Sequence, residues 1–155
     1  MTINARPIEE ADLTPCAEVF VTVFGNPPWN EAWDIGDVKT RLEEMYRTPG
    51  SYGVIASEDN EVLGFAMGCA EQWRRGKKHF YLKEMCVLPD RQRRGIGTEI
   101  VETLCRNLTE MGIEAIYLLT ARDSPAQAFY EKLGFHVNAK MIMLGKYLPY
   151  STTGC

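Results

Sequence analysis

The fold is decided by the stretch Val87-Leu88-Pro89-Asp90-Arg91-Gln92-Arg93-Arg94-Gly95-Ile96-Gly97-Thr98. An apolar run ends at Leu88, a basic loop with two glycines follows, and a helical pattern begins at about Thr98. This order of strand, loop and helix presents the free backbone N–H groups of a helix N-terminus to a phosphate. Gly95 and Gly97 let a ligand approach the backbone closely. Positive charge where a pyrophosphate would sit comes from Arg91, Arg93 and Arg94.

Two common nucleotide-binding motifs are excluded by the same loop. The dinucleotide fingerprint requires a third glycine after Gly97, and the sequence offers none there. The P-loop ends in Gly-Lys-Ser/Thr, whereas Gly97-Thr98 lacks the lysine. The remaining interpretations are a different phosphate-binding loop or a basic turn before a surface helix.

The sequence after the loop predicts an alternation of helices and strands. A helix over residues 98–111 is indicated by apolar residues at helical spacing, with Gly112 as its stop: Ile100, Val101, Leu104, Cys105, Leu108 and Met111. The β-forming run 113–120 predicts a strand. A second helix then begins with Ser124 as N-cap, Pro125 in its first turn and Gln127 as capping-box partner. Such an order is typical of α/β domains.

Two blocks of this region resemble the GNAT superfamily of N-acetyltransferases. Residues 92–97, Gln-Arg-Arg-Gly-Ile-Gly, resemble the family's Gln/Arg-x-x-Gly-x-Gly/Ala signature, which cradles the pyrophosphate of acetyl-coenzyme A. Residues 126–135 are similar to the family's Asn-x-x-Ala-x-x-x-Tyr-x-x-x-Gly-Phe block. One departure is Asp123, at a position where the family often has asparagine, because an ionised carboxylate accepts hydrogen bonds but donates none.

The resemblance covers roughly residues 3–147 and implies a fold. We expect a single N-acetyltransferase domain over residues 1–155, of the α/β (α+β) class, with a mixed, mostly antiparallel sheet of about seven strands and about four helices. Earlier in the chain, we expect strands near residues 2–6, 52–57, 62–71 and 80–88. We also expect two helices, one with Pro15 in its first turn and a second capped by Asp34. A final hairpin is expected through residues 135–147.

The composition of the chain limits which classes of partner and which locations we expect for the protein. The chain has 155 residues and a net charge of −4, which argues against nucleic acid as the main partner. No apolar run approaches the ~18 residues of a membrane span, and we see no signal-peptide core. Five cysteines without paired spacing predict reduced thiols and a cytoplasmic location. No zinc-site spacing is present, so we expect no metal.

Amine acetylation requires a base for the amine and an acid for the departing thiolate. Glu84 is the candidate base, because it is a charged residue inside an otherwise apolar strand. Glu71, at the end of the preceding strand, is the alternative base. The alternative for Glu84 is that it pairs with a neighbouring cation or faces water. Tyr130, on the family's block, is the candidate acid. Cys86 has no evident basic partner, which favours packing over an acyl-relay role.

The resemblance implies further site residues. Pantetheine would bind main-chain groups at a splayed strand. The complete set of candidate cofactor-binding residues is Met85, Cys86, Val87, Gln92, Arg93, Arg94, Gly95, Ile96, Gly97, Thr98, Asp123, Ala126 and Phe129. Aromatic and acidic residues would hold the acceptor by cation–π contact and ion pairing: Trp29, Trp33, Glu31 and Glu71. Core packing of the tryptophans is the alternative.

The sequence thus predicts an enzyme that moves an acetyl group from acetyl-CoA to a primary amine within a ternary complex. The acceptor would be a small cationic amine or a peptide amine, and the enzyme would form a homodimer if its last strands pair. The alternative is a non-catalytic acyl-CoA-binding or sensing module, which would not need Glu84 and Tyr130.

Overall fold

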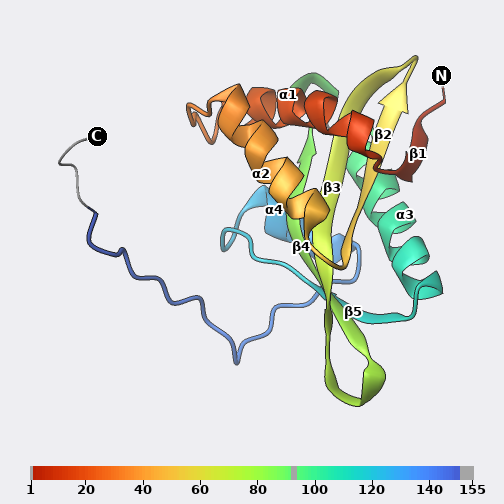
Figure 1. Cartoon of the computed structure of the whole chain (residues 1–155), viewed down its shortest axis with the longest axis vertical. Coiled ribbons are helices and arrows are strands. Elements are labelled where there is room, and N and C mark those ends of the chain that lie inside the picture. The colour runs from red at the N-terminus through yellow and green to blue at the C-terminus, as the bar shows by residue number, and fades with distance from the viewer. Residues whose placement is uncertain (1, 92–93, 151–155) are drawn as a thin grey trace. The chain divides into compact units, whose positions relative to one another are not determined.

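The computed structural model describes residues 2–91 and 94–150, which fall into two compact units, Met1–Leu119 and Thr120–Cys155. The first unit contains one sheet of five strands in the order β1-β2-β3-β4-β5 (Figure 1). These strands are β1 (Asn4–Pro7), β2 (Ser51–Glu58), β3 (Glu61–Gln72), β4 (Lys78–Val87) and β5 (Ile113–Tyr117). The first four pair antiparallel, and β5 is parallel to β4.

Three α-helices complete the first unit: α1 (Leu13–Phe24), α2 (Ile35–Arg47) and α3 (Ile96–Glu110). Short 3-10 turns lie at Glu10–Asp12, Arg74–Gly76 and Pro89–Arg91. Asp34 caps α2, since its carboxylate accepts the N–H of Asp37 at 3.1 Å. The β2–β3 turn at Asp59-Asn60 has positive φ at both residues, as a tight hairpin requires.

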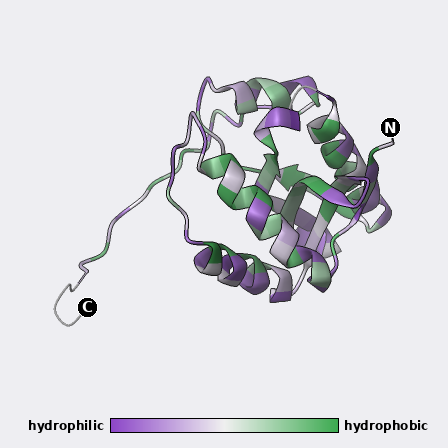
Figure 2. Ribbon diagram, turned by 90° about the horizontal axis from the view of Figure 1, so that it is seen from above, coloured by the Kyte–Doolittle hydropathy of each residue, from purple (hydrophilic) through white to green (hydrophobic). Residues whose placement is uncertain are grey.

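The helices cover both faces of the sheet, with α1 and α2 on one face and α3 on the other (Figure 1). Side chains of α1 and α2 form the main core with Ile55, Phe65, Met67 and Cys86 of the strands. The opposite face is covered by the apolar stripe of α3, buried at Ile96, Ile100, Val101, Leu104 and Leu108. The strands between the helices are largely hydrophobic (Figure 2), because both faces of the sheet are buried there.

A β-bulge in β4 changes which side chains share a face. Met67 pairs with Glu84 but Gly68 pairs with Leu82, so Lys83 is the extra residue. A Cβ on Gly68 would lie 2.0 Å from the carbonyl oxygen of Tyr81, so only glycine fits this close approach. The bulge turns Glu84 toward α2, onto the face that Met67 occupies.

The second unit contains one helix, α4 (Pro125–Lys132), among its described residues. The expected cap is confirmed: Ser124 accepts the N–H of Gln127 at 3.1 Å. The expected final hairpin is wrong for the described residues 135–150, which have no strand, so the sheet has five strands rather than about seven. Residues 141–144 are apolar, but they are 69–85% exposed and pair with no strand among the described residues. A β-forming segment becomes a strand only where it pairs with the edge of another strand.

The predicted bounds of two further elements differ from the observed bounds by a few residues. The α3 helix begins at Ile96 rather than near Thr98, and β5 ends at Tyr117 rather than residue 120. In the part of the chain that the structure describes, no helix is long and apolar enough to span a membrane.

Candidate active site

The loop between β4 and α3 has the geometry of an anion site. Gly95, the N-cap of α3, has φ of 79°, a left-handed conformation that glycine adopts without strain. No atom of the described residues lies within 4 Å of a Cβ built on it, so that part of the chain leaves room beside Gly95. The first helical hydrogen bond runs from the N–H of Glu99 to Gly95, at 3.0 Å. The N–H groups of residues 96–98 precede it and are therefore available to a phosphate.

The described arginine side chains of this loop pair with carboxylates of the protein. Arg94 does not stand alone as a positive charge, because its guanidinium contacts Glu58 at 3.3 Å. Ile96 is buried, so only its backbone can serve a ligand. Gln92 and Arg93 lie outside the described residues.

The strands β4 and β5 separate where the cofactor was expected. Their parallel ladder ends at the pair Tyr81–Tyr117, whereas β4 continues to Val87 and stays paired with β3 throughout. Met85 and Cys86 therefore lie beyond the last contact with β5. A splayed strand of this kind is what an extended pantetheine arm needs for main-chain hydrogen bonds.

Glu84 is buried, with 7% of its surface exposed, on the α2 side of the sheet. Arg41 of α2 reaches it: its Nε donates to Oε1 at 2.7 Å, and its Nη2 contacts the same oxygen. Among the described residues, no donor is found for Oε2. Burial raises the pKa of the Glu84 carboxyl, and Arg41 opposes that rise without cancelling it.

Cys86 follows Glu84 on the same strand but is not a reactive thiol. Its side chain is part of the α1–α2 core. Burial raises the pKa of the thiol well above its usual range, and the nearby Glu84 carboxylate raises it further. The thiolate required of a nucleophile is therefore disfavoured, and packing explains this residue.

The expected acceptor residues of the α1–α2 connection pack on α1. The rings of Trp33 and Phe20 form a T-shaped pair with centroids 5.1 Å apart, and Nε1 of Trp33 donates to Glu31 at 2.6 Å. Trp29 lies against Phe24 at 5.4 Å and is 43% exposed. Both tryptophans thus pack on α1, and Trp29 keeps an exposed surface.

A tyrosine pair that the sequence did not single out lies where β4 and β5 separate. Tyr81 and Tyr117 stack with centroids 4.8 Å apart and planes within 2°. The hydroxyl of Tyr117 donates to Glu71 at 3.4 Å. Cys69 pairs with Tyr81 across the ladder and packs against the α1–α2 core, so this pair is on the same face as Glu84. The adjacent register of Tyr81 and Tyr117 could be recognised only once the β4–β5 pairing was known.

In the second unit, Tyr130 lies between two aromatic rings. Its centroid is 5.2 Å from Phe129 and 5.3 Å from Phe135, both edge-on. Asp123 has a positive φ of 56°, and its N–H donates to the side chain of Gln127 at 2.6 Å. Ala126 is in the first turn of α4. The family block therefore forms the capped helix that the sequence predicted.

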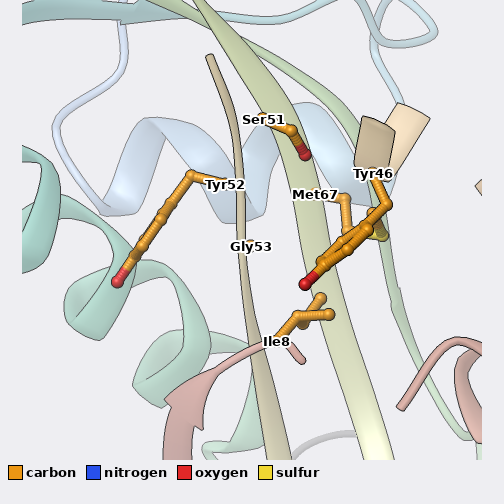
Figure 3. Close-up of a pocket in the computed structure, with 6 residues that line it drawn as sticks. All are labelled: Ile8, Tyr46, Ser51, Tyr52, Gly53 and Met67. Carbon is orange, nitrogen blue, oxygen red and sulfur yellow. The ribbon is translucent and has the colours of Figure 1, made fainter. Parts of the chain in front are cut away.

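A cavity of about 300 Å³ lies elsewhere in the first unit, lined by Ile8, Tyr46, Ser51, Tyr52, Gly53 and Met67 (Figure 3). In the close-up, the ring of Tyr52 lies on the other side of β2 from Tyr46 and Ile8. The lining of this cavity includes none of the predicted site residues. No cluster of three or more His, Cys, Asp or Glu side chains in residues 2–91 and 94–150 is placed to hold a metal ion.

Comparison with known proteins identifies the family. The family model described as "Acetyltransferase (GNAT) family" matches residues 20–135, three quarters of the chain. The chain belongs to the GNAT family. It is an acetyl-CoA-dependent N-acetyltransferase, and the family's chemistry is acyl transfer to amines.

Relatives of this GNAT enzyme act on different amines. L-amino acid N-acyltransferase MnaT of Escherichia coli (strain K12) is 26% identical over 149 residues, covering 92% of this chain and 85% of the relative. The [ribosomal protein bS18]-alanine N-acetyltransferase of Haemophilus influenzae is 27% identical over 104 residues, covering 67% of this chain and 64% of the relative.

Solved structures share the fold. The aminoglycoside N-acetyltransferase AAC(6')-Iy in complex with CoA matches with a TM-score of 0.75 and 18% identity, over 95% of this chain and 96% of that chain. A possible acetyltransferase from Clostridium difficile 630 matches with a TM-score of 0.81 and 14% identity, over 97% of this chain and all of that chain.

Proposed function

We propose that this enzyme transfers an acetyl group from acetyl-CoA directly to a primary amine in a ternary complex, with a small cationic amine or a peptide amine as acceptor. The observation that carries the proposal is Glu84. It is a buried carboxylate with one oxygen held by Arg41, on β4 beyond the point where β5 separates. The sensing-module alternative gives no reason for such a group.

The cofactor is assigned to the loop and the separated strand. Its pyrophosphate would accept hydrogen bonds from the N–H groups of residues 96–98 at the start of α3. Its pantetheine arm would bond to the main chain of Met85 and Val87. The resemblance of residues 126–135 to the family block implies that Asp123, Ala126 and Phe129 also bind the cofactor. Open space beside Gly95 supports this assignment.

The acceptor must lose a proton before it attacks. An alkylammonium group has a pKa near ~10.4, so a neutral amine at pH 7 costs about 4–5 kcal/mol. Glu84, with its raised pKa, would take that proton directly or through water. The amine nitrogen then forms the new N–C bond, the C–S bond breaks, and Tyr130 donates its phenolic proton to the departing thiolate.

A cationic acceptor is favoured by the surroundings of Glu84. The stacked Tyr81 and Tyr117 present aromatic faces, and Glu71 adds a carboxylate beside them. Trp29 and Glu31 would form the rim on the α1–α2 connection. The relatives that act on amino acids and on a protein alanine are consistent with an amine of small size or at a chain terminus. Homodimer formation and a cytoplasmic location remain predictions.

Calorimetric titration with acetyl-CoA, followed by an amine panel with release of free CoA as readout, tests the proposal. We expect one-site binding that Gly95→Glu abolishes, because its carboxylate would stand where the pyrophosphate binds. Turnover should fall at least about tenfold in Tyr130→Phe with acetyl-CoA binding retained. Phe135→Leu, which alters the ring beside Tyr130 but removes no proton, is the control. Binding without transfer to any amine, or full turnover in Tyr130→Phe, would contradict the assigned roles.

A further inference from the structure

Glu58, the last residue of β2, is a buried carboxylate outside the proposed chemistry, with 6% of its surface exposed. Each of its oxygens contacts a different arginine of the cofactor loop. Oε2 lies 3.3 Å from Nη1 of Arg91, and Oε1 lies 3.3 Å from Nη2 of Arg94. The β2–β3 hairpin is therefore joined to both sides of residues 92–93. We call Glu58, Arg91 and Arg94 the arginine clamp.

Backbone hydrogen bonds fix the turn after β4 that carries Arg91. The N–H of Leu88 donates to Leu63 of β3 at 2.8 Å, and the N–H of Arg91 donates to Leu88 at 2.9 Å. These bonds place Arg91 beside the β2–β3 hairpin, where it reaches Glu58. Glu61, which is 55% exposed, makes a single contact of 3.3 Å with Arg91. The clamp thus rests on one buried carboxylate, Glu58, with two exposed carboxylates, Glu61 and Asp90, beside Arg91.

The clamp's charges are largely used within the protein. Arg91 contacts Glu58, Glu61 and Asp90, and Arg94 contacts Glu58, so three carboxylates offset the charge of the two guanidinium groups. A buried carboxylate that loses its cationic partners is strongly disfavoured, so the pairing holds the loop where it is. Arg94 directly precedes Gly95, whose conformation directs the N–H groups of α3.

We propose that Glu58 is a positioning residue for acetyl-CoA. Through Arg91 and Arg94 it fixes the loop so that the amides at the start of α3 face the pyrophosphate. The inference rests on the proposed placement of the pyrophosphate at this helix terminus. It assigns the two arginines to holding the loop and leaves phosphate recognition to the backbone.

The test measures the affinity of Glu58→Gln for two probes, acetyl-CoA and S-acetylpantetheine, which lacks the pyrophosphate. We expect about tenfold weaker binding of acetyl-CoA and unchanged binding of S-acetylpantetheine, since a tenfold change corresponds to about 1.4 kcal/mol. Glu61→Gln is the matched control, and we expect it to bind acetyl-CoA within about twofold of the wild type. Equal weakening toward both probes would indicate general loss of structure and overturn the proposal, as would tighter or unchanged acetyl-CoA binding.

A second variant keeps the proposal testable if Glu58→Gln does not fold. Arg94 is partly exposed, so Arg94→Gln should fold and should weaken acetyl-CoA binding several-fold without affecting S-acetylpantetheine. Where both single variants fold, the double variant completes a cycle. The effect of Glu58→Gln should shrink in the Arg94→Gln background, and full additivity would overturn the clamp. Absence of acetyl-CoA binding by the wild type would refute the cofactor placement itself, which is a separate result.

Discussion

The junction of β1 and α1 and the centre of β4 each hold a buried carboxylate with one arginine, yet the two behave oppositely. At the junction, Arg6 grips both oxygens of Asp12, at 2.8 and 2.9 Å, and the N–H of Glu9 adds a third bond of 2.7 Å. On β4, Arg41 contacts only Oε1 of Glu84. The first carboxylate is fully supplied with donors and the second is not.

The pKa directions follow from this difference. The hydrogen bonds from Arg6, helped by the N–H of Glu9, lower the pKa of Asp12 despite its burial. Burial raises the pKa of Glu84 despite Arg41. A carboxylate with hydrogen bonds to both oxygens stabilises the fold, whereas one with a single bonded oxygen is available for proton transfer.

The largest expected effect is on catalysis. Glu84→Gln keeps the shape of the side chain but removes its ability to accept a proton, so kcat should fall by about 10²–10⁴-fold with acetyl-CoA affinity unchanged. Steady-state kinetics and calorimetry measure the two quantities. Glu71→Gln tests the alternative base on the neighbouring strand. If Glu71→Gln abolishes turnover and Glu84→Gln does not, the two roles must be exchanged.

The next largest effect is on stability, and it should distinguish Asp12 from Glu84. Asp12→Asn should lower the free energy of unfolding by about 1–3 kcal/mol, because it weakens a filled network. Glu84→Leu should leave the free energy of unfolding unchanged or raise it, because replacing a buried ion pair by an apolar side chain is often neutral or stabilising. Arg41, which is 43% exposed, can turn its guanidinium to water in this variant. Urea unfolding followed by fluorescence measures both.

The pH dependence supplies the control for this stability difference. The contribution of Asp12, whose pKa is lowered on folding, is complete above its unfolded pKa and is lost as the pH falls through the folded value. Repeating the unfolding below the usual Asp range should therefore shrink the gap between wild type and Asp12→Asn. A gap that stays constant down to such pH would show that packing, not charge, makes the difference.

The smallest expected effect is a shift of the pH–rate profile. The acidic limb of kcat/KM should lie above the ordinary range of a glutamate, since Glu84 must be ionised to act and burial raises its pKa. Arg41→Gln should move this limb to still higher pH, because Arg41 lowers that pKa. Movement toward lower pH would mean that Arg41 does not stabilise the ionised form.

Local features could be predicted from the sequence because they depend on neighbouring residues. The caps at Asp34 and Ser124, the turn at Asp59-Asn60 and the glycine at the start of α3 all follow from the conformations those residues favour. The burial of Glu84 was anticipated from its place in an apolar strand, although the bulge at Lys83 sets the face on which it lies. The final hairpin was wrong because a strand depends on a partner edge that lies elsewhere in the chain.

The sequence by itself therefore determined the family, the order of the elements up to α4 and the identity of the candidate base. Only the tertiary structure decided which charges meet, since Arg41 and Glu84 are 43 residues apart, and Glu58 lies 33 and 36 residues from its two arginines. The bulge at Lys83 and the separation of β4 from β5 after Tyr81 also depend on register. The physical reason is that propensity acts over a few residues, whereas pairing of strands and of buried charges is fixed by the packing of the whole unit.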